Sequence, residues 1–205
     1  MTRIHAPVAE VFTHLPAIHT ETGIPPRGVA HVGAHTGQEV PAYRRTGYHP
    51  ILLIEPNPYL IPTLQTIDDV EVVHAAAGTH NGTTTLHITG WDQLSSTLTP
   101  RPLLNRYKVT EHINVPAVRL DTLLDERHTT LVIDTQGTEL DVLKGADLTG
   151  VPLAVIECCT PPRYEGAATP DDIVDYMHTA GFTLHSQWRH GAVSDVVFTR
   201  HQPTH

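Results

Sequence analysis

The stretch AHVGAHTGQEV, residues 30–40, combines the end of an apolar strand, a turn with two glycines and the start of a helix. Such a turn is a common frame for a nucleotide-like ligand, because glycine lets the backbone come close to the ligand. Gly33 and Gly37 are spaced G-x-x-x-G, however, and the dinucleotide fingerprint G-x-G-x-x-G is absent. The stretch therefore predicts an α/β fold with a ligand at this turn, and the identity of the ligand has to come from the rest of the chain.

Unbroken apolar runs that end in an acid recur beyond this turn. ILLIE (51–55), TLVID (130–134) and PLAVIE (152–157) have this form, which is typical of parallel strands buried on both faces. VEVVHAAAG (70–78) predicts a further strand with a turn of small residues. The alternation with helical patterns predicts a mostly parallel sheet. Helices are expected over residues 7–15, 38–48, 58–66, 138–144 and 170–182.

The last two strands are predicted to form an antiparallel hairpin. TLHSQW (183–188) and SDVVFTR (194–200) are separated by only five residues. A parallel pair needs a crossover of about a dozen residues or more, so these two strands have to run in opposite directions.

The middle of the chain departs from simple alternation. GTTTLHIT (82–89) and INVPAVRL (113–120) look like strands joined by a long connection, and long connections in compact domains are often functional. We expect one domain over residues 1–205. Within it, residues 1–27 should form a helical N-terminal extension whose helix ends at Pro16.

The composition of the 205-residue chain is acidic and typical of a folded protein. Apolar residues make up 40% of it, and the net charge is −9, which argues against a nucleic-acid partner because phosphates need a basic surface. No long apolar run predicts a membrane span, and no signal peptide is recognised at the start. The only cysteines are the neighbours Cys158 and Cys159, which form no disulfide framework. We therefore expect a cytoplasmic protein in which these cysteines pack as small residues.

Histidine is common, with 16 residues, but its spacing does not predict a metal site. His31 and His35 flank the glycine turn and lack the pattern H-E-x-x-H on a helix, while His201 and His205 lie in a polar tail. The histidines are therefore expected to lie scattered over the surface.

Four expected strand ends carry chemically distinctive residues, and an open parallel sheet binds its ligand at these ends. They are the Gly33–Gly37 turn, Glu55, Asp134 and Glu157. Glu55 follows the first glycine of the turn by 22 residues, close to the offset of about 20 at which an acid binds ribose hydroxyls. AAAG (75–78) offers a smooth wall for a flat base. Each feature alone is also explained by a tight turn or a solvated strand end, but together they predict a single nucleoside.

Four motifs carry a resemblance to a known family. They are HVGAHTGQE (31–39), LLIEPNP (52–58), VRLDTLL (118–124) and LVIDTQGTELDVLKGA (131–146). Together they resemble the FkbM-type family of S-adenosylmethionine-dependent methyltransferases. The usual pattern of that family at the fourth strand is D-x-E-G-x-E, whereas this chain has Gln136 in place of the first glutamate.

The resemblance implies a doubly wound, mostly parallel seven-stranded sheet that ends in an antiparallel hairpin. It also implies S-adenosylmethionine as the cofactor, with its methionine part over the Gly33–Gly37 turn, its carboxylate near the helix N-terminus at residues 36–39 and its ribose on Glu55. Members of the family methylate hydroxyls of polyketides, glycolipids and sugars, and among its small members the chain is similar to enzymes that methylate the 1-hydroxyl of a methylmannose oligosaccharide. The expected cofactor-binding residues are Gly33, Ala34, His35, Gly37, Gln38, Glu39, Glu55, Pro56, Ala76 and Asp134.

Transfer of a methyl group to a hydroxyl requires that the hydroxyl lose its proton to a base or be acidified by a metal. Asp134 and Glu157 end strands that are neighbours in the strand order of the family, and neighbouring strands lie about 4.8 Å apart. We therefore predict that Asp134 and Glu157 are catalytic and bind Mg²⁺, and that Gln136 hydrogen-bonds the acceptor. The alternative is that Asp134 caps the next helix and Glu157 pairs with a basic residue.

The predicted acceptor is a hydroxyl of a small sugar or glycoside. Nitrogen acceptors are less favoured, because the motif N-P-P-Y is absent after the fourth strand. Ser95–Thr97, Trp91 and Tyr164 should overhang the acceptor, although packing of a loop explains them equally well. Two alternative functions remain open: a nicotinamide-dependent oxidoreductase and a non-catalytic module that binds an adenosyl ligand. The acceptor and the oligomeric state stay open, and a homo-oligomer is one alternative.

Overall fold

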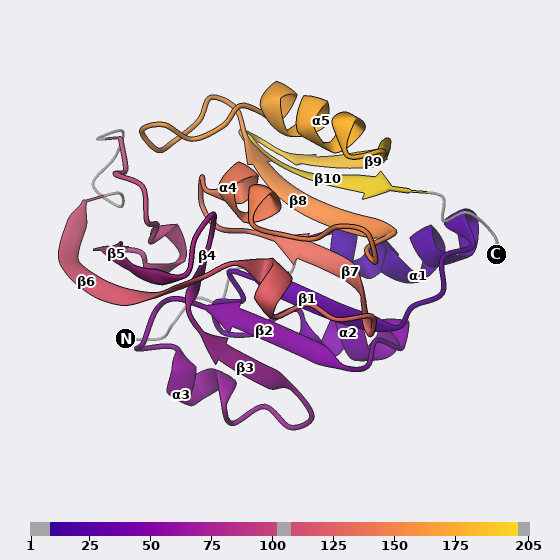
Figure 1. Ribbon diagram of the computed structural model, residues 1–205, viewed down its shortest axis with the longest axis horizontal. Helices are drawn as coiled ribbons and strands as arrows, with labels where there is room; N and C mark the ends of the chain where they lie inside the picture. Colours follow the sequence, from indigo (N-terminus) through magenta and orange to yellow (C-terminus); the bar gives the residue numbers. More distant parts are fainter. Residues whose placement is uncertain (1–8, 102–107, 201–205) are drawn as a thin grey trace.

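The computed structural model describes residues 9–101 and 108–200. The predicted sheet of seven strands is confirmed (Figure 1). The order across the sheet is β3 (Glu71–His74), β2 (Ile51–Glu55), β1 (Gly28–Val32), β7 (His128–Ile133), β8 (Leu153–Cys159), β10 (Val193–Thr199) and β9 (Thr183–His190). Strands β3, β2, β1, β7 and β8 are parallel to one another. Strand β10 is antiparallel to both of its neighbours, β8 and β9, as the hairpin prediction requires.

Helices cover both faces of this sheet, which explains the unbroken apolar runs of its central strands. Val132 and Val155 pack with α1 (Val11–Thr22), α2 (Val40–Thr46) and the last residue of α3 (Ile61–Leu64) on one face. Their neighbours Leu131 and Ala154 pack with α4 (Glu139–Lys144) and α5 (Pro170–Thr179) on the other. None of the helices in residues 9–101 and 108–200 is long and apolar enough to cross a membrane.

The N-terminal helix does not end at Pro16, so this part of the prediction is wrong. Helix α1 continues through Pro16 to Thr22. Proline removes one backbone hydrogen bond, but Leu15 and Ile18 lie on either side of it and are both buried against the sheet and α2. Burial of this apolar stripe offsets the lost hydrogen bond, because tertiary packing contributes most of the stability of such helices.

The middle of the chain forms a second, smaller sheet. The strand expected over residues 70–78 is interrupted at Ala75, and β4 (Ala76–Ala77) leaves the large sheet to pair with β6 (Val109–Val118). Strand β5 (Gly82–Thr89) is antiparallel to β6. Figure 1 shows this small sheet beside one end of the large sheet.

The strand order reverses between β1 and β7, which places the topological switch point there. The chain leaves β1 toward β2 and β3 on one side, and returns to β7 and β8 on the other side. The carboxyl ends of these parallel strands lie at the same edge of the sheet, where residues of the small sheet also meet them. A ligand site is therefore expected at this edge.

Candidate active site

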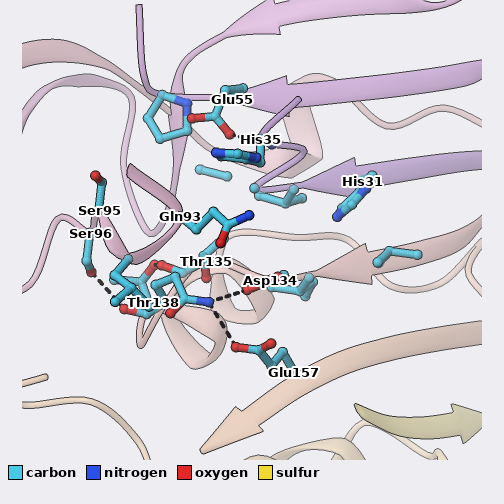
Figure 2. A pocket seen from close by; sticks show the side chains of 18 of the residues that line it. His31, His35, Glu55, Gln93, Ser95, Ser96, Asp134, Thr135, Thr138 and Glu157 are labelled. Atoms are coloured by element: carbon cyan, nitrogen blue, oxygen red, sulfur yellow. Dashed lines mark hydrogen bonds between the residues drawn. The ribbon is translucent and has the colours of Figure 1, made fainter. Parts of the chain in front are cut away.

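A cavity of about 270 Å³ opens at the carboxyl ends of β1, β2, β7 and β8 (Figure 2). Most residues predicted from the sequence line it, whereas Ala34 and Gly37 do not. Ser95–Thr97 also line it, as expected of the long connection, together with the short helix η1 (Asp92–Leu94). The predicted residues that line the cavity are Gly33, His35, Gln38, Glu39, Glu55, Pro56, Ala76, Asp134, Gln136 and Glu157.

The two glycines of the turn are required by packing inside the protein. Gly33 has φ +83°, and a Cβ atom there would lie 1.8 Å from the carbonyl oxygen of Asp134. Gly37 has φ +72°, and its Cβ would lie 2.6 Å from the Cδ1 atom of Ile67. Close approach of β1 to the end of β7 explains Gly33, and close approach of the turn to Ile67 explains Gly37. Of the two glycines, only Gly33 also lines the cavity.

We expect Gly33→Ala to lower the free energy of unfolding by more than about 3 kcal/mol, since a left-handed backbone and an overlap with a carbonyl oxygen add up. Gly47→Ala is the matched control, because Gly47 has φ +94° but nothing within 4 Å of its Cβ position. The control should lose only about 1–2 kcal/mol. Urea unfolding measures the free energy of unfolding of both variants. Equal losses in the two variants would refute the close approach of Gly33 to the carbonyl oxygen of Asp134.

Glu55 holds the turn by accepting two backbone hydrogen bonds. Its Oε2 accepts from the N–H of His35 and its Oε1 from the N–H of Asn57, both at 2.8 Å. Burial raises the pKa of Glu55 to about 7, although these two hydrogen bonds favour its charged form. Each carboxylate oxygen can accept more than one hydrogen bond, so Glu55 can hold ribose hydroxyls in the cavity that it lines.

Asp134 and Glu157 lie side by side, as the sequence predicted, because Ile133 pairs with Ile156 in the parallel register. The amide of Gln136 lies between the two carboxylates: its Nε2 donates to Oδ1 of Asp134 at 2.6 Å and to Oε1 of Glu157 at 2.9 Å (Figure 2). Both hydrogens of the amide are used in these contacts. Gln136 therefore holds the two acids together and has no amide hydrogen left for the predicted contact with the acceptor.

Burial raises the pKa of Asp134 and of Glu157, and the charge of Asp134 raises that of Glu157 further. Hydrogen bonds from Gln136 and Glu157 favour the charged form of Asp134. Burial thus favours the protonated form of both acids, and the hydrogen bonds to Asp134 make it the member of the pair that ionises more readily. Such a pair can accept one proton and release another, as a general base needs to do.

The cluster does not fit the predicted Mg²⁺ ion. Only two carboxylates converge, and the amide nitrogen of Gln136 donates to both from the position between them. Within residues 9–101 and 108–200 no group of three or more histidine, cysteine, aspartate or glutamate side chains is placed to hold a metal. Mg²⁺ prefers oxygen ligands in octahedral geometry. The group between the two carboxylates is the amide nitrogen, while the amide oxygen lies 3.1 Å from the hydroxyl of Tyr164.

The turn that carries Gln136 is held from three sides. Gln136 has φ +57°, and Glu139 Oε1 accepts the N–H of Gly137 at 2.8 Å and that of Thr135 at 3.2 Å. Ser96 Oγ donates to the carbonyl of Gln136 at 2.8 Å. The hydroxyl of Tyr164 lies 3.1 Å from Gln136 Oε1. Tyr164 is therefore a buried support of this turn and does not overhang the cavity as predicted.

Among the histidines that the structure describes, three are buried, contrary to the expectation of a scattered surface distribution. They are His19, His31 and His128. Burial lowers the pKa of His31 to about 3, so this residue is neutral beside the cavity. His35 is half-buried, and its Nε2 lies 3.4 Å from Oδ1 of Asp92 across the mouth of the cavity.

Asp195 is a cavity residue that the sequence interpretation missed. It lies on β10, directly opposite Glu157 of β8, and is buried. The only local sign of a cavity residue here is that an acid precedes the apolar run VVF. The position of Asp195 opposite Glu157 depends on the register of β10 against β8, which the local sequence does not reveal.

The cavity is strongly acidic. In the described part of the chain, Arg163 is its only lysine or arginine, and the neutral His31 adds no charge. The acids that line it are Glu39, Glu55, Asp92, Asp134, Glu157 and Asp195. Such a lining favours a ligand with positive charge and disfavours phosphates.

The family model of the methyltransferase FkbM domain matches residues 31–184, which is well over half of the chain. No curated protein matches the sequence significantly. Among solved structures, methyltransferase FkbM from Methylobacillus flagellatus KT has a TM-score of 0.60 at 15% identity. The match covers 90% of this chain but 47% of that one, so the present chain spans about half the length of that protein.

Two further structures have the same fold at low identity. Magnesium protoporphyrin IX methyltransferase from Synechocystis PCC 6803, solved with bound S-adenosylmethionine, has a TM-score of 0.54 at 8% identity, over 94% of this chain and 79% of that chain. TrmK from M. capricolum, solved with S-adenosylhomocysteine, has a TM-score of 0.54 at 5% identity, over 94% and 69% of the two chains.

Proposed function

The chain belongs to the FkbM methyltransferase domain family, and from this premise we propose that it is an S-adenosylmethionine-dependent O-methyltransferase. The proposed acceptor is a hydroxyl of a small sugar or glycoside. One observation carries the proposal: an acidic cavity lies at the switch point of the sheet, with Glu55 at one end and the Asp134–Glu157 pair at the other.

The proposed cofactor, S-adenosylmethionine, is supported by the position of Glu55 and by the negative charge of the cavity lining. Glu55 is placed to bind the ribose, and the neighbouring Pro56 and Ala76 line the same part of the cavity. S-adenosylmethionine carries a sulfonium cation, which suits the acidic lining, and it supplies the methyl group. The pyrophosphate of a nicotinamide dinucleotide would have to enter the same acidic cavity without a G-x-G-x-x-G turn. This argues against the oxidoreductase alternative.

The acceptor half of the proposal rests on the carboxylate pair. A hydroxyl has to lose its proton to a base before it can accept the methyl group. We propose Asp134 as this base, because hydrogen bonds from Gln136 and Glu157 favour its charged form. Buried acids with strongly raised pKa values cluster at functional sites, which argues against a module that only binds a ligand. The acidic surroundings also argue against phosphorylated acceptors and nucleic acid, in agreement with the net charge.

The likeness to enzymes of methylmannose oligosaccharides, a cytoplasmic location and a single domain over residues 1–205 remain predictions. The free thiols Cys158 and Cys159 agree with a reducing compartment. Cys158 is buried as expected, and its raised pKa, caused by burial, suits a packing residue.

Gln136→Glu should turn the pair of acids into a metal site. It places a third carboxylate between Asp134 and Glu157, and an uncompensated buried charge costs about 3–5 kcal/mol. We expect the free energy of unfolding to fall by about that amount at pH 8, and Mg²⁺ or Mn²⁺ to restore part of it. Gln93→Glu is the control, because Gln93 also lines the cavity but, among the described residues, has no hydrogen bond to either acid. Equal stabilisation of the wild-type protein by Mg²⁺ would overturn our conclusion that the native cluster does not fit a metal.

The experiment that tests the proposed function is a screen with S-adenosylmethionine labelled in its methyl group. Neutral sugars, glycosides, amino sugars and sugar phosphates are offered to the whole chain, with EDTA and with Mg²⁺. We expect label in neutral hydroxylated acceptors, at equal rates in both conditions. Transfer to nitrogen only, or to sugar phosphates only, would contradict the proposal.

A further inference from the structure

Among the described buried acids in and around the cavity, Asp195 is the one that lies beside an exposed histidine. Glu55 and Glu139 accept backbone hydrogen bonds, Asp134 and Glu157 share the amide of Gln136, and Glu39 lies 3.9 Å from the buried His31. Within the described residues, the contact of the Asp195 carboxylate is an ion pair, in which its Oδ2 lies 3.6 Å from Nε2 of His190. His190 ends β9, and its side chain is 42% exposed, whereas that of Asp195 is 9% exposed.

These two residues connect the carboxylate pair to the outside of the protein. Asp195 is the direct cross-strand partner of Glu157, so their side chains lie on the same face of the sheet, with Cβ atoms about 4.5–5.5 Å apart. Asp195 lines the cavity together with Glu157. The order Asp134, Glu157, Asp195, His190 therefore runs from the buried end of the cavity to solvent.

We propose that Asp195 and His190 form the route by which the proton of the acceptor hydroxyl leaves the cavity. This inference rests on the proposed function. The two residues act through Asp134 and Glu157 and have no contact with the transferred methyl group. A separate route is useful because cofactor and acceptor together would fill the mouth of the cavity and exclude water.

The transfer balances as follows. The acceptor oxygen forms a bond to the methyl carbon, the bond between that carbon and sulfur breaks, and its electron pair stays on sulfur. The hydroxyl proton moves to Asp134, and Glu157 passes its own proton to Asp195. Asp134 then passes the accepted proton to the neighbouring Glu157. Asp195 protonates His190, which releases the proton to water. Each carboxyl group returns to its starting state, and no further reactant is needed.

The groups that face Asp195 set its titration. The pKa of Asp195 is raised to about 6, mainly by burial and also by the negative charge of Asp134, while His190 acts in the opposite direction. Glu157 on β8 and Glu39 before α2 also face it, and its charge in turn raises the pKa of both. Asp195 is thus ionised at neutral pH and able to receive a proton from Glu157.

A first test needs no acceptor. The side-chain carboxyl carbon of Asp195, assigned by its loss in Asp195→Asn, is titrated by ¹³C NMR in the whole chain. We expect a midpoint near pH 6, and a midpoint about half a unit higher in His190→Gln, because a nearby positive charge is lost. His185→Gln is the matched control: His185 lies on the same strand, 3.6 Å from Glu21, away from the cavity. A midpoint that does not respond to His190→Gln overturns the route.

A second test uses an acceptor that the wild-type protein methylates. We expect kcat of Asp195→Asn and of His190→Gln to fall about tenfold, which is less than for loss of the base itself. Imidazole in the buffer should restore His190→Gln but not Asp195→Asn, and calorimetry should show unchanged affinity for S-adenosylhomocysteine. Full kcat in both variants, or a loss that appears only in cofactor affinity, would overturn the route. If the wild-type protein methylates nothing, the proposed function fails, while the NMR titration still decides whether Asp195 and His190 interact.

Discussion

Asp134→Asn is expected to slow methyl transfer by about a hundredfold or more, the scale of a lost general base. The substitution keeps the shape of the side chain and its place opposite Gln136, but it removes the negative charge that receives the proton. The affinity for S-adenosylhomocysteine should change little, because Glu55 at the other end of the cavity is untouched. Initial rates with labelled cofactor and calorimetry of the product measure the two effects separately.

The neighbouring acid provides a second variant. Glu157→Gln should also reduce turnover by about a hundredfold, because the amide cannot take up and release a proton in place of the carboxyl group. Glu111→Gln is the control, since Glu111 is exposed and contacts only the hydroxyl of Tyr59 among the described residues. Full activity in both Asp134→Asn and Glu157→Gln would reject the pair as the base, and His35, which also lines the cavity, would become the next candidate.

The free energy of unfolding is expected to fall by several kcal/mol between pH 5 and pH 8. Burial raises the pKa of Glu39, Glu55 and Glu139 to about 7 and that of Asp195 to about 6. An acid whose pKa is higher in the folded state stabilises the protein fully below its unfolded pKa. This stability is lost as the pH rises through the folded value. Each unit of difference corresponds to about 1.4 kcal/mol. Most of the loss should fall between about pH 5 and pH 7, where the folded protein binds these protons and the unfolded chain does not.

Urea unfolding at a series of pH values measures this dependence. Glu39→Gln should flatten it, because one of the buried acids no longer ionises, whereas Glu111→Gln at the surface should leave it unchanged. Saturating S-adenosylmethionine should also reduce the loss at pH 8, since a cationic ligand favours the ionised acids. A protein as stable at pH 8 as at pH 5 would show that these carboxyl groups are not buried as described.

The large sheet could be predicted from the sequence because strands that are buried on both faces consist of continuous apolar runs. ILLIE is apolar at all four positions before its acid and TLVID at the three positions before its acid. This pattern can be recognised without knowledge of distant contacts. The hairpin followed from the length of a connection alone. The positions of Glu55, Asp134 and Glu157 at one edge followed in turn, because parallel strands end at the same edge of a sheet.

Features that depend on contacts between distant residues were missed or misjudged. Whether Pro16 ends a helix depends on how deeply its neighbours are buried, which the local pattern does not reveal. The position of Asp195 opposite Glu157 depends on the register of β10 against β8. The amide of Gln136 reaches both acids because its turn is held by Glu139, and the predicted metal site failed for this reason.

The central claim is that the acidic cavity at the switch point binds an S-adenosyl ligand. Isothermal titration calorimetry of the whole chain with S-adenosylhomocysteine, and in parallel with NAD, tests this claim most directly. The account predicts that S-adenosylhomocysteine binds at one site per chain and that NAD gives no heat of binding. Binding of NAD without binding of S-adenosylhomocysteine would contradict it.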